Sequence, residues 1–109
     1  MTTLALIYTV LPTKEAATNL ANHIIKTRQG ACVNIFPCQS FYEWSGEIHD
    51  APEYGMIIKT TSEQCSLLTA YIAKNHPYQT PAILYTSSIS AWPPFGEWIN
   101  SQVTSDAST

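Results

Sequence analysis

Residues 31–61 read ACVNIFPCQSFYEWSGEIHDAPEYGMIIKTT, and this stretch decides the fold. Residues 31–44 are rich in β-branched and aromatic side chains, and residues 53–61 alternate with the period of a strand. The dipeptide at 45–46, Ser-Gly, is typical of a turn. We therefore predict a long β-hairpin, with a bulge or a sheet edge at Pro37 because proline cannot donate to a ladder.

Five further elements flank this hairpin, each marked by hydrophobic periodicity and by capping or stop residues. They are a strand at 4–11, a helix at 14–29 capped by Thr13 and ended by Gly30, a helix at 62–75 capped by Ser62, a strand at 82–89 and a short helix at 97–103. The order β, α, β, β, α, β is that of the ferredoxin-like fold, an α+β sandwich with both helices on one face of an antiparallel sheet. We expect one domain over residues 1–109, with 104–109 as a frayed tail.

The charge content excludes several classes of partner. Charged residues make up 12% of the chain, about half the usual share, and the formal net charge is −3. The five Lys and Arg residues are scattered, which argues against nucleic-acid binding. No apolar run is long enough to span a membrane and no signal-peptide pattern is present, so we expect no membrane partner and a cytoplasmic location. Three cysteines without a CxxC pair suit a reducing compartment.

One face of the predicted sheet has no helix to cover it. The strand at 4–11 is apolar on both sides and the hairpin is aromatic, so copies of the chain are expected to cover that face. Aromatic rings are enriched at such interfaces, although Tyr42, Trp44, Tyr78 and Trp98 could instead line a ligand cleft. The predicted interface residues are Tyr42, Trp44, Tyr54 and Trp98.

Enzymatic signatures are missing from the sequence. It contains no GxSxG elbow, no HExxH, no GxxxxGK followed by Ser or Thr, and no GxGxxG after a strand. A spatial pair of Cys32 and His76 is the remaining nucleophile-and-base alternative. We expect a protein that is not an enzyme, with no catalytic residues.

Five segments together resemble the CutA family of divalent-cation tolerance proteins, and they extend over nearly the whole chain. The segments are ACVNI at 31–35 with Pro37, SFYEWSGEI at 40–48, Glu53 ahead of IIKT at 57–60, HPYQTP at 76–81, and WI at 98–99. The resemblance implies a cytosolic homotrimer of ferredoxin-like subunits, similar in architecture to the PII signalling proteins. It also implies a role in tolerance to copper and other divalent metal ions.

The resemblance also suggests metal ligands. In bacterial members associated with copper, these are a cysteine late in the first strand and two adjacent histidines before the Pro-Tyr pair. The corresponding positions here hold Thr9, Asn75 and His76, so His76 is the one ligand retained. We expect a weak Cu²⁺ site in which Glu53 or Cys32 joins His76 across a subunit cleft, and no other cofactor. The alternatives are that His76 caps the helix at 62–75 and that Cys32 simply packs.

Three functional classes follow from the sequence. The first is a trimeric protein that binds or buffers divalent metals. The second is a PII-like module that holds a small anion between subunits, with Lys59 and Arg28 as its cationic partners. The third is a trimeric scaffold for another protein. The group His49, Asp50 and Glu53 could hold a metal ion, but a solvated hairpin loop has the same composition.

Overall fold

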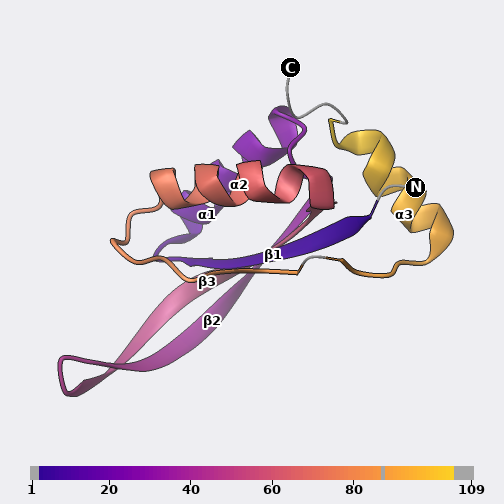
Figure 1. The fold of residues 1–109 in the computed structure, drawn as a ribbon. Helices are drawn as coiled ribbons and strands as arrows, with labels where there is room; N and C mark the ends of the chain where they lie inside the picture. Colours follow the sequence, from indigo (N-terminus) through magenta and orange to yellow (C-terminus); the bar gives the residue numbers. More distant parts are fainter. Residues whose placement is uncertain (1–2, 87, 105–109) are drawn as a thin grey trace.

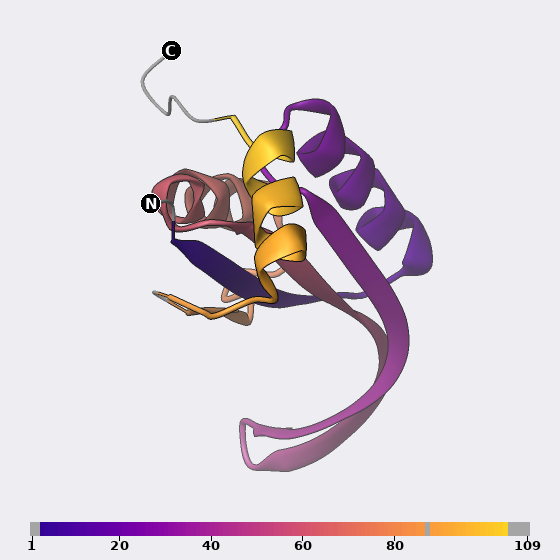
Figure 2. The same cartoon turned by 90° about the vertical axis from the view of Figure 1, so that its right-hand side faces the viewer.

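A computed structural model of the chain describes residues 3–86 and 88–104. The strands are β1 (Leu4–Leu11), β2 (Cys32–Trp44), β3 (Glu47–Thr61) and β4 (Ile83–Tyr85), and the helices are α1 (Lys14–Lys26), α2 (Ser62–Asn75) and α3 (Pro93–Gln102). The strands form one antiparallel sheet in the order β2-β3-β1-β4, and α1 and α2 lie together on one of its faces (Figure 1). This arrangement confirms the predicted ferredoxin-like order. α3 stands across the end of the sheet near the start of β1 (Figure 2).

The main hydrophobic core lies between the sheet and the helices α1 and α2. Ala5 and Ile7 of β1 and Ile58 of β3 are fully buried there, against Ile24 of α1 and Leu68 of α2. Successive strand residues point to opposite faces, so the residues between these point away from the helices. We call that opposite surface, which neither α1 nor α2 covers, the helix-free face; α3 meets it at Lys59. It comprises Leu6, Tyr8, Val10, Cys32, Asn34, Phe36, Cys38, Glu53, Gly55, Ile57, Lys59 and Leu84.

The hairpin is longer than the sequence indicates. Ser45 and Gly46 both have positive φ angles, 54° and 80°, as in the two-residue turns that continue the strand twist. Pairing therefore starts at once, from Trp44 opposite Glu47, and the predicted start of the return strand at residue 53 was wrong. Pro37 lies on the edge strand β2, as predicted, and the continuous one-to-one register leaves no bulge there. The hairpin bends away from α1 and α2, toward the side of the helix-free face (Figure 2).

The ends of α1 confirm one prediction and correct another. The Thr13 hydroxyl accepts a hydrogen bond from the Ala16 amide at 3.0 Å, as expected of an N-cap. The helix stops at Lys26 rather than at residue 29, and the left-handed residue is Arg28, with φ 60°, rather than Gly30. Gly30 serves close packing instead, because an added Cβ would lie 2.7 Å from Cγ2 of Ile24.

The start of α2 and the last strand also differ from prediction. The N-cap of α2 is Thr61 rather than Ser62, and its hydroxyl accepts from the Gln64 amide at 3.4 Å. β4 has three residues rather than the eight predicted at 82–89. Beyond β4, the pairing with β1 is reduced to an isolated bridge between Leu4 and Ile89. Residue 87 lies outside the described residues.

The C-terminal helix begins four residues earlier than predicted. Pro93 opens α3, and the helix ends at Gln102. Proline is well tolerated in a first turn, because its missing N–H would have no partner within the helix there. Thr104 is not frayed, because its amide donates to the Arg28 carbonyl at 2.9 Å; residues 105–109 of the predicted tail lie outside the described residues. Among the described helices, none combines the length and the apolar composition needed to cross a membrane.

Candidate functional site at the base of the hairpin

Glu53 lies where the hairpin leaves the body of the sheet. β1 pairs with β3 as far as Leu11 opposite Tyr54, so Glu53 is the first β3 residue beyond the end of β1. Its cross-strand neighbour on β2 is Cys38. The residue is only 9% exposed, and within the described residues its carboxylate has no ion-pair partner. A largely buried carboxylate without a cation is unusual, because burial penalises an uncompensated charge.

The donor to this carboxylate is a tyrosine from the loop after α2. The Tyr78 hydroxyl donates to Oε2 of Glu53 at 2.5 Å, across 25 residues of sequence. Burial, this hydrogen bond and the charge of Glu53 raise the pKa of Tyr78 well above its ordinary value. Burial, with smaller contributions from Cys38 and Glu53, also raises the pKa of Tyr8. The site therefore gathers one carboxylate and two neutral phenols on the border of the helix-free face.

His76 positions Tyr78 rather than presenting a free imidazole. Its Nε2 lies 2.8 Å from the Val10 carbonyl oxygen, and its Nδ1 lies 3.1 Å from the Tyr78 backbone nitrogen. A neutral ring protonated on Nε2 satisfies both contacts, since Nε2–H donates to Val10 and Nδ1 accepts from Tyr78. The imidazole thus ties the loop after α2 to β1. It occupies the C-cap position of α2, in line with one alternative, but its hydrogen bonds go to the strand and the loop.

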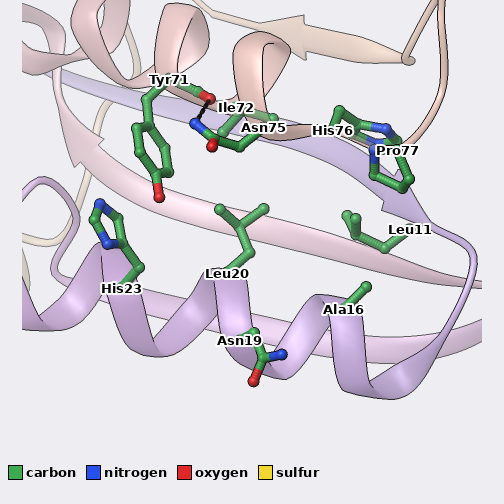
Figure 3. A pocket seen from close by; sticks show the side chains of 10 residues that line it. All are labelled: Leu11, Ala16, Asn19, Leu20, His23, Tyr71, Ile72, Asn75, His76 and Pro77. Atoms are coloured by element: carbon green, nitrogen blue, oxygen red, sulfur yellow. Dashed lines mark hydrogen bonds between the residues drawn. The ribbon is translucent and has the colours of Figure 1, made fainter.

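A pocket of about 360 Å³ opens beside this site, between α1 and α2 (Figure 3). Figure 3 shows His76 and Pro77 at one end and His23 facing Tyr71 at the other. The His23 and Tyr71 rings stack almost in parallel, with centroids 4.2 Å apart and planes 4° apart. Neither residue of this pair was singled out from the sequence. Between the two ends the lining is mostly apolar.

Of the residues proposed to share a metal, Glu53 and His76 both contact Tyr78, but Cys32 is not brought next to either of them within one chain. Glu53 neighbours Cys38, whereas Cys32 lies opposite Lys59, whose Nζ is 3.9 Å from the Cys32 sulfur. Among residues 3–86 and 88–104, no three His, Cys, Asp or Glu side chains form a group able to hold a metal ion. His49, Asp50 and Glu53 on the hairpin therefore do not form such a group.

The members of that hairpin group have other contacts. The His49 ring stacks on Tyr42 with centroids 5.3 Å apart. Asp50 accepts a hydrogen bond from the Gln39 side-chain amide in the exposed part of the hairpin. The composition of a solvated hairpin therefore accounts for this group better than a metal site does.

The positions that the family resemblance links to copper also fit a metal poorly. Thr9 is fully buried on the helix side of β1, and its hydroxyl is the one buried side-chain oxygen or nitrogen of the described residues without a hydrogen-bond partner. The Asn75 side chain donates to the Tyr71 carbonyl of its own helix at 2.9 Å. Both ring nitrogens of His76 are engaged. These donors do not make a Cu²⁺ site within a single chain.

The two cations proposed for an anionic ligand have other contacts. The Arg28 guanidinium donates to the Ser101 carbonyl at 2.9 Å, which ties the end of α1 to α3. The Lys59 ammonium lies 5.6 Å from the centre of the Phe95 ring. No described contact brings the two cations to one place.

Three of the four predicted interface residues are exposed. Trp44 is 64% exposed, Tyr42 and Trp98 are also open to solvent, and Trp98 stacks on Phe95 at 5.7 Å. Tyr54 lies instead on the helix side, packed against the cluster formed by Leu11, Ala17 and Met56. An interface on the helix-free face would therefore use Tyr8 and Phe36, whose rings stack at 6.4 Å, rather than Tyr54.

Replacing Tyr78 by phenylalanine is expected to lower the free energy of unfolding by about 1 kcal/mol at pH 7, because it leaves the Glu53 carboxylate without its donor. Solvent at the partly exposed Tyr78 keeps the loss at this modest level. The raised pKa of Tyr78 stabilises the folded state fully below pH 10, the ordinary tyrosine value, and this contribution is lost as pH rises further. The deficit of Tyr78→Phe should therefore shrink above pH 10. Urea unfolding at pH 7 and above pH 10 measures both effects.

The matched control for this variant is Tyr85→Phe, which removes an exposed hydroxyl that has no hydrogen bond among the described residues. It should change stability by less than about 0.5 kcal/mol. Equal stabilities of Tyr78→Phe and wild type at pH 7 would show that the hydrogen bond to Glu53 contributes nothing.

Comparisons with known proteins identify relatives along almost the entire chain. A sequence model described as "CutA1 divalent ion tolerance protein" matches residues 5–102. The "Divalent-cation tolerance protein CutA" of Archaeoglobus fulgidus is 36% identical over 97 residues, which are 89% of this chain and 95% of that protein. The corresponding protein of Thermotoga maritima is 34% identical over 90% of this chain and 97% of its own length.

Solved structures agree with the sequence matches. The CutA1 structure from Ehrlichia chaffeensis superimposes with a TM-score of 0.88 at 37% identity, over 94% of this chain and 96% of that one. CutA from Synechococcus elongatus superimposes with a TM-score of 0.89 at 33% identity, over 95% of this chain and 93% of that one. Both similarities include the long hairpin, since nearly the whole of each chain is covered.

Proposed function

Because the chain belongs to the CutA1 family of divalent ion tolerance proteins, we propose that it acts in divalent-cation tolerance as a homotrimeric interaction module, similar in architecture to the PII signalling proteins. The copies assemble through the helix-free face. The site around Glu53 and Tyr78 then lies at the contact between subunits. The cytoplasm remains the expected location.

The observation that carries this proposal is the uncovered apolar surface opposite the helices. Tyr8, Phe36 and Ile57 are half-buried on the helix-free face, and Leu84 at its margin is 65% exposed. Residues 41–50 of the hairpin are exposed throughout, including Ile48 at 79%. The accessible surface is 6939 Å², against roughly 6,000 Å² expected for a compact monomer of this mass. Large apolar side chains left open to solvent in this number are typical of a protein contact site.

The sheet edges support the same assembly. Within the described residues β2 and β4 are the outer strands, so each presents one row of backbone groups without a strand partner. Long open edges invite pairing with another chain, and β2 is 13 residues long. A neighbouring copy that adds a strand along β2 would close this edge. The family resemblance supplies the number of copies, three.

In this proposal the protein binds divalent metal ions only weakly. His76, Glu53 and Cys32 each have another contact within the chain, which supports an interaction module over a metal store. Copper prefers imidazole and thiolate ligands that are free to bind. We therefore expect no tight Cu²⁺ site formed by one chain.

Calorimetric titration with Cu²⁺ at pH 7.5 tests this expectation on the wild type and on His76→Gln. Glutamine keeps a donor near the position of Nε2 but removes the imidazole, so the contact to the Val10 carbonyl is retained. The two proteins should bind Cu²⁺ weakly and agree within about twofold in affinity. Mg²⁺ should give no heat, since it requires oxygen ligands in octahedral array.

A loss of about tenfold or more in Cu²⁺ affinity in His76→Gln would contradict this expectation. It would make the imidazole a metal ligand and the trimer a metal-binding protein. A tight site of unchanged affinity in both proteins would contradict it as well, since the metal would then be held by other residues.

A further inference from the structure

Two side chains of opposite charge point from β3 to the helix-free face. Glu53 and Lys59 lie an even number of positions apart on this strand, so they are on the same side of it as Ile57. Neighbouring Ile58 and Thr60 are fully buried on the other side. Within the described residues, neither Glu53 nor Lys59 has an ion-pair partner.

The two charges cannot neutralise each other within one chain. They lie six steps of the strand apart, which is about 20 Å at the usual rise per residue. Glu53 is held by Tyr78 at the base of the hairpin, and Lys59 lies near the end of β3 beside Cys32 and Phe95. Each side chain is at least half-buried, where an unpaired charge is costly and an opposite charge is strongly attracted.

We propose that a second copy supplies the missing counter-ion, so that Glu53 of one subunit pairs with Lys59 of the next. The inference rests on the proposed homotrimer and adds the contact that sets its geometry. In a closed ring of three, each interface joins two different patches of the same surface. The chain offers two such patches, an acidic one with Tyr78 and Tyr8 and a basic one with Phe95. Three equivalent pairs then give each of these charges a partner.

The shape of the chain agrees with this head-to-tail contact. The acidic patch lies at the base of the hairpin, and the basic patch lies toward the end of the sheet where α3 stands (Figure 2). They therefore occupy opposite ends of the helix-free face. The hairpin bends toward the side of that face, as an arm that reaches a neighbouring subunit would (Figure 2).

A double-mutant cycle tests the pair with neutral variants of similar shape. Glu53→Gln keeps a carbonyl acceptor for Tyr78, and Lys59→Met keeps the aliphatic stem over Phe95. Trimer dissociation on dilution is followed by light scattering for the wild type, both single variants and the double variant. Each single change should raise the dissociation constant about tenfold or more, and the double variant should be no worse than either single one.

Charge reversal gives a second readout that does not depend on small differences in affinity. Glu53→Lys and Lys59→Glu should each give monomers, whereas the chain carrying both changes should recover the trimer, because every contact again joins opposite charges. Circular dichroism confirms that each variant is folded before its mass is compared.

The results separate this inference from the proposed function. A wild-type chain that is monomeric overturns the homotrimer and the pair together. A wild-type trimer whose single variants have independent, multiplicative effects overturns the pair alone. A wild-type trimer whose dissociation constant is unchanged by either single variant also overturns the pair alone, since the two charges would then be neutralised by ions from solvent.

Discussion

Replacing Ile57 by glutamate is expected to turn the assembly into monomers that keep their fold. Ile57 is half-buried on the helix-free face, opposite Tyr8 on β1 and Asn34 on β2. A carboxylate there would be buried between subunits without a cation, on the same side of the strand as Glu53. The desolvation penalty arises in all three copies, so the trimer dissociation constant should rise at least about 100-fold.

The matched control is Ile25→Glu on α1. Ile25 is 45% exposed and lies on the helix layer, away from the proposed contact, so this variant should remain trimeric. Light scattering gives the mass of each variant, and circular dichroism confirms that Ile57→Glu is folded. A trimeric Ile57→Glu would place the subunit contact elsewhere than on the helix-free face.

Replacing the next residue along, Ile58, by alanine is expected to have a different consequence. Ile58 is fully buried in the core between the sheet and α1 and α2, and its Cγ2 lies close to Gly30. Truncation leaves a cavity, and such changes lower the free energy of unfolding by about 2 to 5 kcal/mol. The change does not touch the helix-free face, so the folded protein should still assemble.

Urea unfolding at a fixed protein concentration measures this loss, since assembly makes stability depend on concentration. Ile25→Ala serves as the control and should cost less than about 1 kcal/mol, because its side chain is partly in solvent. A small effect of Ile58→Ala would contradict the assignment of this strand face to the core. Together, the two adjacent isoleucines test both sides of β3.

The sequence predicts the order of elements because hydrophobic periodicity and capping residues are local signals. The helix at 14–29 and the strand at 4–11 correspond to α1 and β1, and Thr13 caps α1 as predicted. Where two capping residues compete, the sequence is less decisive. Thr61 and Ser62 are adjacent and both are suitable caps, and the strand pairing, which runs as far as Thr61, makes that residue the cap.

The length of the hairpin was underestimated because its outer part lacks a hydrophobic pattern. Residues 47–52 are mostly polar or small and nearly all exposed, so their composition suggests a loop. They pair nonetheless, because the turn at Ser45 and Gly46 sets the register and the strands continue from it. Backbone conformation, rather than side-chain burial, makes this segment a strand.

The residues of the candidate site were identified from the sequence, but the hydrogen bonds that join them were not. Glu53, His76 and Tyr78 were each singled out from the sequence, yet their partners depend on tertiary structure. His76 reaches Val10 across 66 residues, and Tyr78 reaches Glu53 across 25. His76, whose imidazole is a common metal ligand, thus positions the loop after α2 instead. No local sequence pattern reveals this role.

The most direct test of the proposed assembly is the mass of the wild-type chain in solution. Light scattering coupled to size exclusion at micromolar concentration should give about 36 kDa, three times the 12.1 kDa mass of the chain. That result would agree with copies joined through the helix-free face. A mass near 12.1 kDa at the same concentration would contradict the homotrimer and leave the apolar face of the sheet without its proposed cover.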